Sequence, residues 1–277
     1  MNDKPMRRPR GRPKSSWSDE PAPTVQALDR GLLLLKALAK SGSLGLSELA
    51  MSVGVPTSSA HRLMATLESH GFASLDEATQ KWSIGVQAFR VGAAFTQGST
   101  LIETSREVMR ALMEETGETA NLAMADGGEV VFVSQVETQN PIRALFQIGA
   151  RTPMHASGIG KALLAERPRS AVERHLEAHG LPDFTGKTLS TPARLFADLD
   201  ATRARGWALD DEERHVGMRC VAATIHNVYG EAVAGVSVSA PRARFTDEVI
   251  AEIGPKVRRA AEAATEASGG QRALPPD

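Results

Sequence analysis

The sequence predicts an α+β protein with a small helical domain followed by a larger domain around a mostly antiparallel sheet. Three helical patterns and two short strand-like runs follow one another within residues 24–86. Residues 104–267 then alternate strand-like runs with helical patterns. A long helical pattern joins the two regions, and we expect a linker helix over residues 87–103.

Length and composition fit a globular protein of one or two domains. The chain has 277 residues, of which 42% are hydrophobic and 23% charged, close to globular averages. No apolar run approaches the roughly 20 residues that span a bilayer, and the basic start lacks the apolar stretch of a signal peptide. The single cysteine, Cys220, excludes an internal disulfide and a multi-thiolate metal site. We therefore expect a cytoplasmic protein with no membrane partner, no cofactor and no metal.

Positive charge is concentrated at the front of the chain. Residues 1–90 hold 12 Lys and Arg against 8 Asp and Glu, whereas residues 91–277 hold 20 against 25. This asymmetry indicates that the front binds a polyanion. Residues 1–23 are rich in Pro, Arg, Lys and Ser without apolar periodicity, so we expect a disordered basic tail.

Within this tail, residues 9–13 (Pro-Arg-Gly-Arg-Pro) resemble an AT-hook. The glycine has no side chain to meet the floor of a groove, and the prolines keep the chain extended. Arg10 and Arg12 would then lie along a narrow A·T-rich minor groove, whose negative potential attracts arginine. A low-complexity basic linker is the alternative interpretation.

Residues 24–86 predict a winged helix-turn-helix domain. The expected elements are a helix over 25–40, a short helix over 46–53, a turn over 54–56, a helix over 57–70 and a hairpin of 72–75 with 81–85. Ser41-Gly42 ends the first helix. We expect Ser47 to cap the second helix and Thr57 to cap the third.

The outer face of the third helix is suited to contact double-stranded DNA. In a helix-turn-helix, the second helix enters the major groove with its N-terminal residues nearest to the base edges. Hydroxyl groups pair with several bases, and arginine grips guanine or phosphate. The expected DNA contacts are Thr57, Ser58, Ser59, His61 and Arg62 from this helix and Lys81 from the hairpin. A winged helix that binds protein instead of nucleic acid is the alternative.

The second domain is expected over residues 104–267, after a break in the helical pattern at Gly98-Ser99. Strand-like runs lie at 120–125, 130–136, 142–148, 207–210, 221–228 and 232–239, and helical patterns at 158–165, 169–179, 193–205 and 247–267. Residues 268–277 are rich in Gly and Pro, and we expect a disordered tail.

A small-residue loop leading into a helix suits an anion. Over residues 155–161, the backbone N–H groups of Gly158, Ile159 and Gly160 would be free at the helix start, where the partial positive charge lies. Without side chains at the two glycines, a ligand can come close.

Other polar groups of the second domain complement this loop. Ser237 and Ser239 share one face of a strand because they are two residues apart. Cys220 begins another strand and Asp210 ends a third. Hydroxyls, a thiol, a carboxylate and N–H donors together suit a small ligand with one carboxylate and one carbonyl or hydroxyl group.

Catalysis by Cys220 is a competing interpretation. The thiol with His155, His215 or His226 would make a thiol–imidazole pair. No orienting partner stands at a recognisable spacing, and the front domain would have no role in such an enzyme. We therefore expect a protein that is not an enzyme and has no catalytic residues.

The chain is similar to the IclR family of bacterial transcriptional regulators over residues 24–266. The motifs that carry this resemblance are LSELA at 46–50, residues 58–67 with Gly71, MHASGIGKA at 154–162, DDEE at 210–213 with Gly217 and Cys220, and GVSVS at 235–239. The resemblance implies a winged helix, a linker helix and a GAF-like α/β effector-binding domain, usually assembled as a dimer of dimers on promoter DNA. Thr57 stands where the family often has Lys, which affects the expected base preference.

The resemblance also implies an effector pocket. The positions that match it are Ala144, Gly158, Ile159, Asp210, Cys220, Ser237 and Ser239. Small-acid sensors of this family recognise molecules such as glyoxylate and pyruvate, and other members recognise aromatic acids or larger metabolites. Because Ile159 is bulky and no aromatic residue is among these positions, we expect glyoxylate or a similar 2-oxo acid. An aromatic acid or a larger metabolite is the alternative.

Overall fold

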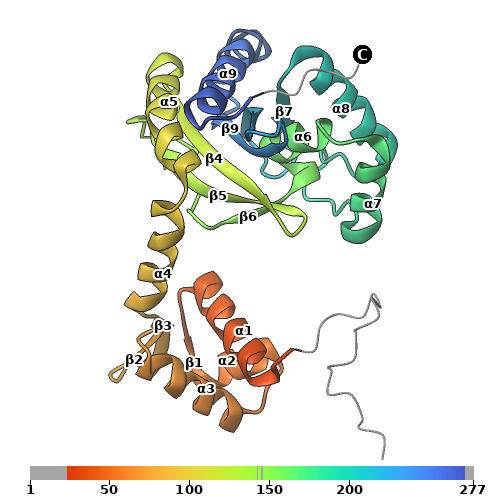
Figure 1. Cartoon of the computed structure of the whole chain (residues 1–277). Helices are drawn as coiled ribbons and strands as arrows, with labels where there is room; N and C mark the ends of the chain where they lie inside the picture. The colour runs from red at the N-terminus through yellow and green to blue at the C-terminus, as the bar shows by residue number, and fades with distance from the viewer. Residues whose placement is uncertain (1–23, 142, 145, 272–277) are drawn as a thin grey trace, which may run out of the picture. The chain divides into compact units, whose positions relative to one another are not determined.

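The computed structural model describes residues 24–141, 143–144 and 146–271, and the chain divides into two compact units (Figure 1). The first unit ends at Ala93 and the second begins at Ala94, so the division falls within helix α4 (Val86–Gln97). Each unit has a hydrophobic core of its own. The predicted basic tail, with Arg10 and Arg12, lies outside the described residues.

The N-terminal unit is a three-helix domain with a small antiparallel sheet. Its elements are α1 (Gln26–Ser41), β1 (Ser43–Gly45), α2 (Leu46–Val53), α3 (Thr57–Ser69), β2 (Ala73–Asp76) and β3 (Lys81–Ile84). The strand order is β1-β3-β2. Leu34, Leu38, Leu49 and Met64 are fully buried between the helices, and Trp82 of β3 packs against them. The predicted winged helix-turn-helix is confirmed.

Helices α2 and α3 begin at the predicted residues, but their caps differ from the prediction. The three-residue strand β1, which pairs with β3, is too short to be predicted from the sequence. The backbone N–H of Gly45 then donates to the Glu48 carboxylate over 2.8 Å, so Ser47 is not the cap. Pro56 precedes α3 and its carbonyl accepts from the Ser59 N–H, so Thr57 is the first helical residue and not the cap.

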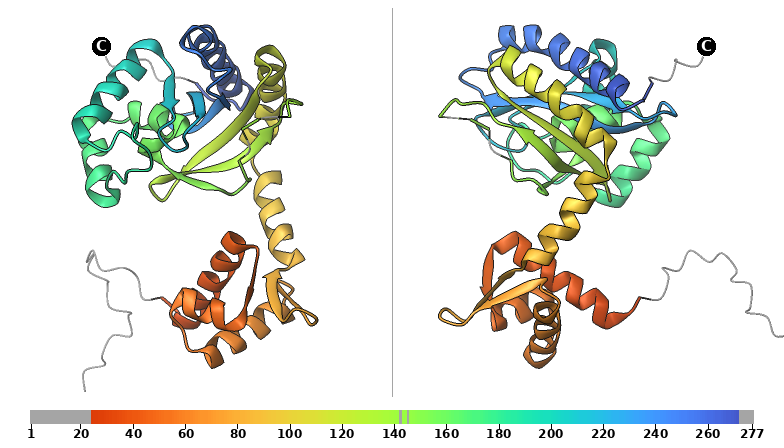
Figure 2. Two further views of the ribbon diagram at one scale, coloured as in Figure 1. Left: turned by 180° about the vertical axis from the view of Figure 1, so that it is seen from behind. Right: turned by 60° about the vertical axis from the view of Figure 1, so that its left-hand side comes forward.

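The C-terminal unit is an antiparallel sheet covered by helices on both faces (Figures 1 and 2). Its elements are α5 (Thr100–Thr116), β4 (Thr119–Asp126), β5 (Glu129–Val136), β6 (Arg151–Pro153), the 3₁₀ turn η1 (Met154–Ala156), α6 (Gly158–Ala165), α7 (Arg169–His179), α8 (Pro192–Arg205), β7 (Ala208–Asp211), β8 (Met218–His226), β9 (Ala232–Pro241) and α9 (Asp247–Ala267). The strand order is β6-β5-β4-β9-β8-β7. The predicted α+β class is confirmed.

The alternation of side chains in the central strands determines what each face of the sheet meets. Val236 and Val238 of β9 lie in the core under α5 and α9, which lie side by side in Figure 2. Ser237 and Ser239 therefore point to the opposite face, which α6 covers. Ala222 of β8 lies in the core on that second face.

Helix boundaries in this unit follow the sequence closely. The helices α6, α7 and α9 begin and end at the predicted residues. The helical pattern after residue 87 breaks as expected, but the first helix ends at Gln97, and Ser99 caps α5 by accepting from the Ile102 N–H. The predicted linker helix over 87–103 is therefore shorter than expected.

Two segments contradict the prediction. The described part of residues 142–148 forms no strand, and pairing with β5 begins only at Gly149, whose N–H donates to the Phe132 carbonyl over 2.7 Å. Residues 268–271 are not frayed: the Gly270 N–H donates to the Thr265 carbonyl over 2.8 Å and the Gln271 N–H to the Asn227 carbonyl over 3.1 Å. Residues 272–277 lie outside the described part of the chain.

Candidate functional site

The outward face of α3 presents polar side chains without intramolecular partners. Thr57, Ser58, His61 and Arg62 are exposed, and Ser59 is half-buried. Among the described residues, none of these five side chains makes a hydrogen bond or an ion pair. The first turn of α3 contains no acidic residue. Hydroxyl and guanidinium groups on this face are therefore free to contact an external polyanion.

In the hairpin that follows α3, the carboxylate of Asp76 is hydrogen-bonded within the turn. The Asp76 side chain accepts from the backbone N–H groups of Ala78 and Thr79, over 2.9 and 3.3 Å. A side-chain hydrogen bond from Thr79, together with these backbone bonds, lowers the pKa of Asp76. Lys81 at the start of β3 is exposed. The backbone of the turn thus binds the Asp76 carboxylate, and the Lys81 ammonium remains exposed to an external partner.

The second candidate site is a small cavity between the start of α6 and the strands β7, β8 and β9. Its volume is about 20 Å³, which is close to the space of one water molecule. Four predicted residues line it: Gly158, Asp210, Cys220 and Ser239. The remaining lining residues, which the prediction missed, are Phe132, Phe146, Thr152, Ala156, Ser157, Arg214, His215, Met218 and Arg219.

Strand register explains why three of the predicted residues meet. Asp210 pairs with Cys220 between β7 and β8, and Cys220 pairs with Ser239 between β8 and β9. Residues paired across an antiparallel sheet point to the same face. The cavity wall is therefore a row of carboxylate, thiol and hydroxyl across three adjacent strands.

The other predicted effector residues are buried but do not line the cavity. Ile159 packs on Gly235, where an added Cβ would lie 2.7 Å from its side chain, so Ile159 does not narrow the cavity. Ala144 is buried in the segment after β5. The Ser237 hydroxyl is fully buried and has no hydrogen-bond partner among the described residues.

Aromatic side chains flank the cavity, contrary to the expectation from the predicted positions. Phe132 and Phe146 stack with their ring centroids 4.5 Å apart. They come from β5 and from the loop that precedes β6, outside the motifs that predict the effector pocket. Only the tertiary fold brings them to the start of α6.

The start of α6 keeps two free backbone donors instead of three. The Ser157 hydroxyl accepts from the Gly160 N–H over 3.3 Å and caps the helix. The N–H groups of Gly158 and Ile159 have no partner within the described part of the chain. A Cβ on Gly158 would lie 3.0 Å from the Cys220 sulfur. The glycine therefore brings the positive end of α6 close to β8.

A buried charge cluster underlies this helix start. Lys161 is completely buried, and its ammonium lies 2.5 Å from Glu213 Oε1 and 3.0 Å from Asp198 Oδ2. Burial opposes its charged form, but the two carboxylates outweigh that effect and raise its pKa. Burial also raises the pKa of Glu213 and of Asp210. The cluster joins α6 to α8 and to the β7–β8 loop.

Burial disfavours the thiolate form of the cysteine in the cavity. Burial, with a smaller effect of the Asp210 charge, raises the pKa of Cys220 to about 12, so the thiolate is scarce near neutral pH. The imidazole of His155 is used elsewhere, because its Nε2 donates to the Pro182 carbonyl over 2.9 Å. His226 approaches Glu166 instead, with Nε2 3.9 Å from Oε1.

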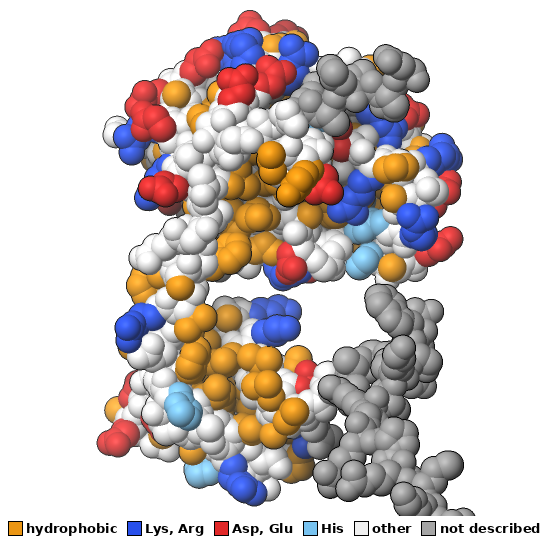
Figure 3. Space-filling view, viewed as in Figure 1, with side chains coloured by type: hydrophobic (Ala, Val, Ile, Leu, Met, Phe, Trp, Pro, Cys, Tyr) orange, Lys and Arg blue, Asp and Glu red, His pale blue; other side chains and the backbone are white. Residues whose placement is uncertain are grey.

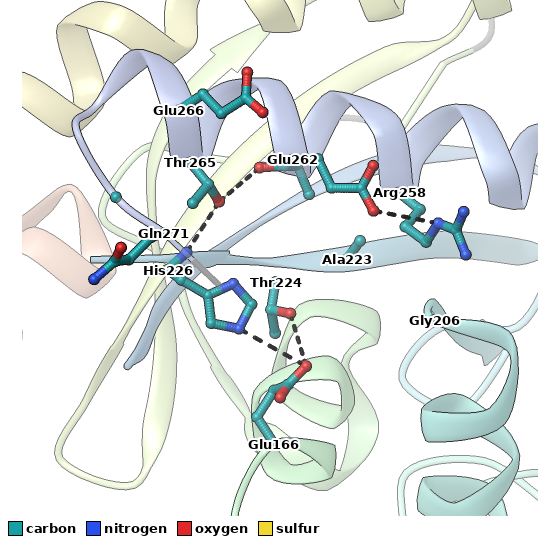
Figure 4. A pocket seen from close by; sticks show the side chains of 12 residues that line it. Glu166, Gly206, Ala223, Thr224, His226, Arg258, Glu262, Thr265, Glu266 and Gln271 are labelled. Atoms are coloured by element: carbon teal, nitrogen blue, oxygen red, sulfur yellow. Dashed lines mark hydrogen bonds and ion pairs between the residues drawn. The ribbon is translucent and has the colours of Figure 1, made fainter. Parts of the chain in front are cut away.

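A second, larger cavity of about 280 Å³ lies between α9, β8 and the end of α6 (Figure 4). Its charged side chains interact with one another: Thr224 donates to Glu166 over 3.2 Å, and Arg258 lies 3.4 Å from Glu262. None of the predicted site residues lines it. The smaller cavity is therefore the better candidate for a ligand site.

In residues 24–271, apart from positions 142 and 145, no three His, Cys, Asp or Glu side chains are placed to hold a metal ion. The helices of this same part of the chain are all too short or too polar to cross a bilayer.

Comparisons with known proteins agree on both units. The family domain described as "IclR helix-turn-helix domain" matches residues 27–77, and the one described as "Bacterial transcriptional regulator IclR C-terminal" matches residues 93–266. The HTH-type transcriptional regulator BhcR of Paracoccus denitrificans is 46% identical over 254 residues, covering 92% of this chain and 91% of that protein. The transcriptional repressor IclR of Escherichia coli is 41% identical over 271 residues, covering 97% and 99%.

A solved structure is similar over nearly the same extent. The crystal structure of a putative IclR transcriptional regulator from Silicibacter shares 26% identity and a TM-score of 0.77. The match covers 89% of this chain and 98% of that chain. The fold of both units therefore occurs in this group of regulators.

Proposed function

Because the chain belongs to the IclR family of bacterial transcriptional regulators, we propose that it represses transcription by binding a promoter site through α3. A small carboxylate effector in the cavity at the start of α6 changes the affinity for that site. The E. coli relative is named a repressor, which supports this direction of regulation.

One observation carries the DNA-binding proposal: the exposed face of α3 has hydroxyl and guanidinium groups that no described residue satisfies. In the major groove, Arg62 would pair with guanine or with phosphate, and the hydroxyls of Thr57 and Ser58 with base edges. Lys81 of the hairpin would contact the backbone. Arg10 and Arg12 of the tail would add minor-groove contacts.

Exposed apolar side chains on the N-terminal unit support self-association. Val25, which precedes α1, is 68% exposed, and Leu28 and Leu32 of α1 are 62% and 49% exposed; Phe89 of α4 is 74% exposed. Figure 3 shows hydrophobic side chains gathered over the face of this unit that carries α1. Paired recognition helices about 34 Å apart would read a palindromic site. We propose a dimer that associates further into a homotetramer.

The small cavity supports a small effector. The N–H groups of Gly158 and Ile159 would bind its carboxylate at the positive end of α6, and Ser239, Cys220 and Asp210 would contact its carbonyl or hydroxyl. With only about 20 Å³ available, glyoxylate or a similar 2-oxo acid requires the least displacement of side chains. The stacked pair Phe132 and Phe146 favours an aromatic acid as the second candidate.

The decisive experiment measures binding of the full chain to a DNA fragment from its own upstream region by fluorescence anisotropy. We expect binding that weakens about 5- to 150-fold when glyoxylate or pyruvate is added. Benzoate, added separately, tests the aromatic alternative. Absence of binding at low ionic strength, with and without these acids, would refute the proposal.

Replacing Arg62 tests the placement of α3. We expect Arg62→Ala to weaken operator binding about tenfold or more, since one good base contact contributes about 1–3 kcal/mol. Lys36→Ala, an equal loss of charge at an exposed position of α1, is the control and should change affinity little. Equal losses in the two variants would show that only net charge matters.

A further inference from the structure

Two arginines line the small cavity, and they differ in how their charges are satisfied. Arg219 is committed: it pairs with Asp211, lies 2.8 Å from Asp247 Oδ1 and donates to the Phe245 carbonyl over 2.7 Å. Arg214 is half-buried, and no carboxylate of the described residues lies within ion-pair distance of its guanidinium. Arg214 therefore lines the cavity with a positive charge that no described carboxylate neutralises.

The guanidinium of Arg214 is held in place by an aromatic ring. It lies 3.8 Å from the centroid of Phe184, within the range of a cation–π contact. The segment that carries Phe184 is fixed to the loop of Arg214, because the hydroxyls of Thr185 and Thr188 donate to the carbonyls of Glu212 and Glu213 over 2.8 and 2.6 Å. This arrangement limits the freedom of the arginine without neutralising it.

The electrostatics of the cavity require a cation for an anionic ligand. Asp210 contributes a carboxylate to the wall, which repels a second carboxylate. Lys161 cannot compensate, since it is paired with Glu213 and Asp198. His215 also lines the cavity, but burial and the adjacent Arg214 lower its pKa, which favours the neutral imidazole. Among the described lining residues, Arg214 is the remaining positive charge that no carboxylate pairs with.

We propose that Arg214 binds the carboxylate of the effector and makes the site selective for acids over uncharged compounds of the same shape. This inference rests on the proposed effector function of the cavity. The guanidinium and the free N–H groups of Gly158 and Ile159 would approach the ligand carboxylate together. Phe184 acts as a positioning residue, because it touches the arginine and does not line the cavity.

The test compares acids with their isosteric amides by calorimetry on the full chain. The probes are glyoxylate, glyoxylamide, pyruvate and pyruvamide. For Arg214→Gln, we expect the acids to bind about 10- to 100-fold more weakly, as for loss of a hydrogen-bonded ion pair, while amide affinities change little. The ratio of acid to amide affinity should therefore collapse. Arg214→Lys should retain part of this ratio.

Two controls separate a contact from a structural effect. Arg174→Gln removes the same charge from an exposed position of α7 that does not line the cavity, and it should keep the wild-type ratio. Thermal unfolding should be unchanged in Arg214→Gln. Phe184→Leu should lower acid affinity by a smaller factor and amide affinity hardly at all.

The outcomes distinguish this inference from the proposed function. If the wild-type protein binds an acid and Arg214→Gln keeps the same ratio of acid to amide affinity, the inference is overturned and the effector site stands. If Arg214→Gln weakens acids and amides equally, the arginine only shapes the cavity, and the inference is again overturned. If the wild-type protein binds none of the four compounds, the effector class itself is wrong, and the inference fails with it.

Discussion

At Gly160, a single methyl group would collide with the backbone of η1. A Cβ at this position would lie 2.3 Å from the Met154 carbonyl oxygen, so the lack of a side chain serves packing of α6 instead of ligand approach. We expect Gly160→Ala to lower the free energy of unfolding by about 1–3 kcal/mol, as overpacking does. Urea denaturation measures this loss. At Gly186, an added Cβ would meet no other atom within 4 Å, so Gly186→Ala should hardly change the free energy of unfolding. An equal loss of stability in the two variants would contradict the proposed packing at Gly160.

His175 couples stability to pH. Burial, followed by the charges of His179, Arg167 and His155, lowers its pKa to about 4. In the unfolded chain the imidazole of His175 binds a proton near pH 6.5, whereas in the folded chain it stays neutral down to about pH 4. The folded state therefore loses stability as the pH falls from about 6.5 to about 4. We expect this one residue to contribute about 1 kcal/mol of that loss, because water reaches the exposed His179 beside it and screens the effect.

The pH effect of His175 is measured as a difference between variants. Urea denaturation at pH 7.5 and at pH 4.5 gives the loss of stability for the wild type and for His175→Gln. The variant should lose about 1 kcal/mol less. His61→Gln, at an exposed position of α3, should lose as much as the wild type. If all three proteins lose the same stability between pH 7.5 and pH 4.5, groups other than His175 cause the acid sensitivity.

At the scale of residues, local patterns in the sequence determine the direction of some of the predicted site residues. Alternation along β9 places Ser239 on the face of Cys220, and the sequence alone shows that alternation. Arg214 directly follows the acidic run of residues 210–213. Whether its guanidinium has an ion-pair partner depends on segments that are distant in the sequence. Phe132 and Phe146 likewise reach the cavity only through the tertiary fold. A sequence pattern does not contain such contacts.

At the scale of elements, helices were predicted more closely than strands. The boundaries of α6 and α9 carry local signals, since Ser157 and Thr246 cap them by accepting from backbone N–H groups. The apolar run at 142–148 has no equivalent signal, and its partly buried residues pack as a loop against the core. The three-residue strands β1 and β6 are too short for a periodicity to develop.

Helix α4 has no buried residue, and this predicts a second chain against it. Full burial of one Phe side chain contributes about 1.5–3 kcal/mol, so the charged variant Phe89→Glu should weaken self-association about tenfold or more. Sedimentation equilibrium measures the shift toward smaller species. Met51→Glu, at a position of α2 that is 80% exposed, should assemble as the wild type does. An unchanged assembly in Phe89→Glu would exclude this helix from the interface.

For the molecule as a whole, two units with separate cores divide two tasks. The N-terminal unit carries the candidate DNA-binding face, and the C-terminal unit carries the candidate effector cavity. Regulation then requires that occupation of one site changes the free energy of binding at the other. The coupling cannot exceed the difference in affinity of the effector for the DNA-bound and the DNA-free protein.

This coupling is reciprocal and can be measured from both ends. If saturating glyoxylate weakens operator binding by a factor between about 5 and 150, saturating operator must weaken glyoxylate binding by the same factor. Calorimetric titration of glyoxylate into the full chain, alone and with the operator fragment, measures the second factor. Arg62→Ala serves as the control at an operator concentration that saturates the wild type but not the variant, because the glyoxylate affinity of the variant should then change less with DNA. If the wild type binds glyoxylate with the same affinity in the presence and absence of DNA, the acid does not act by changing the affinity for the promoter site.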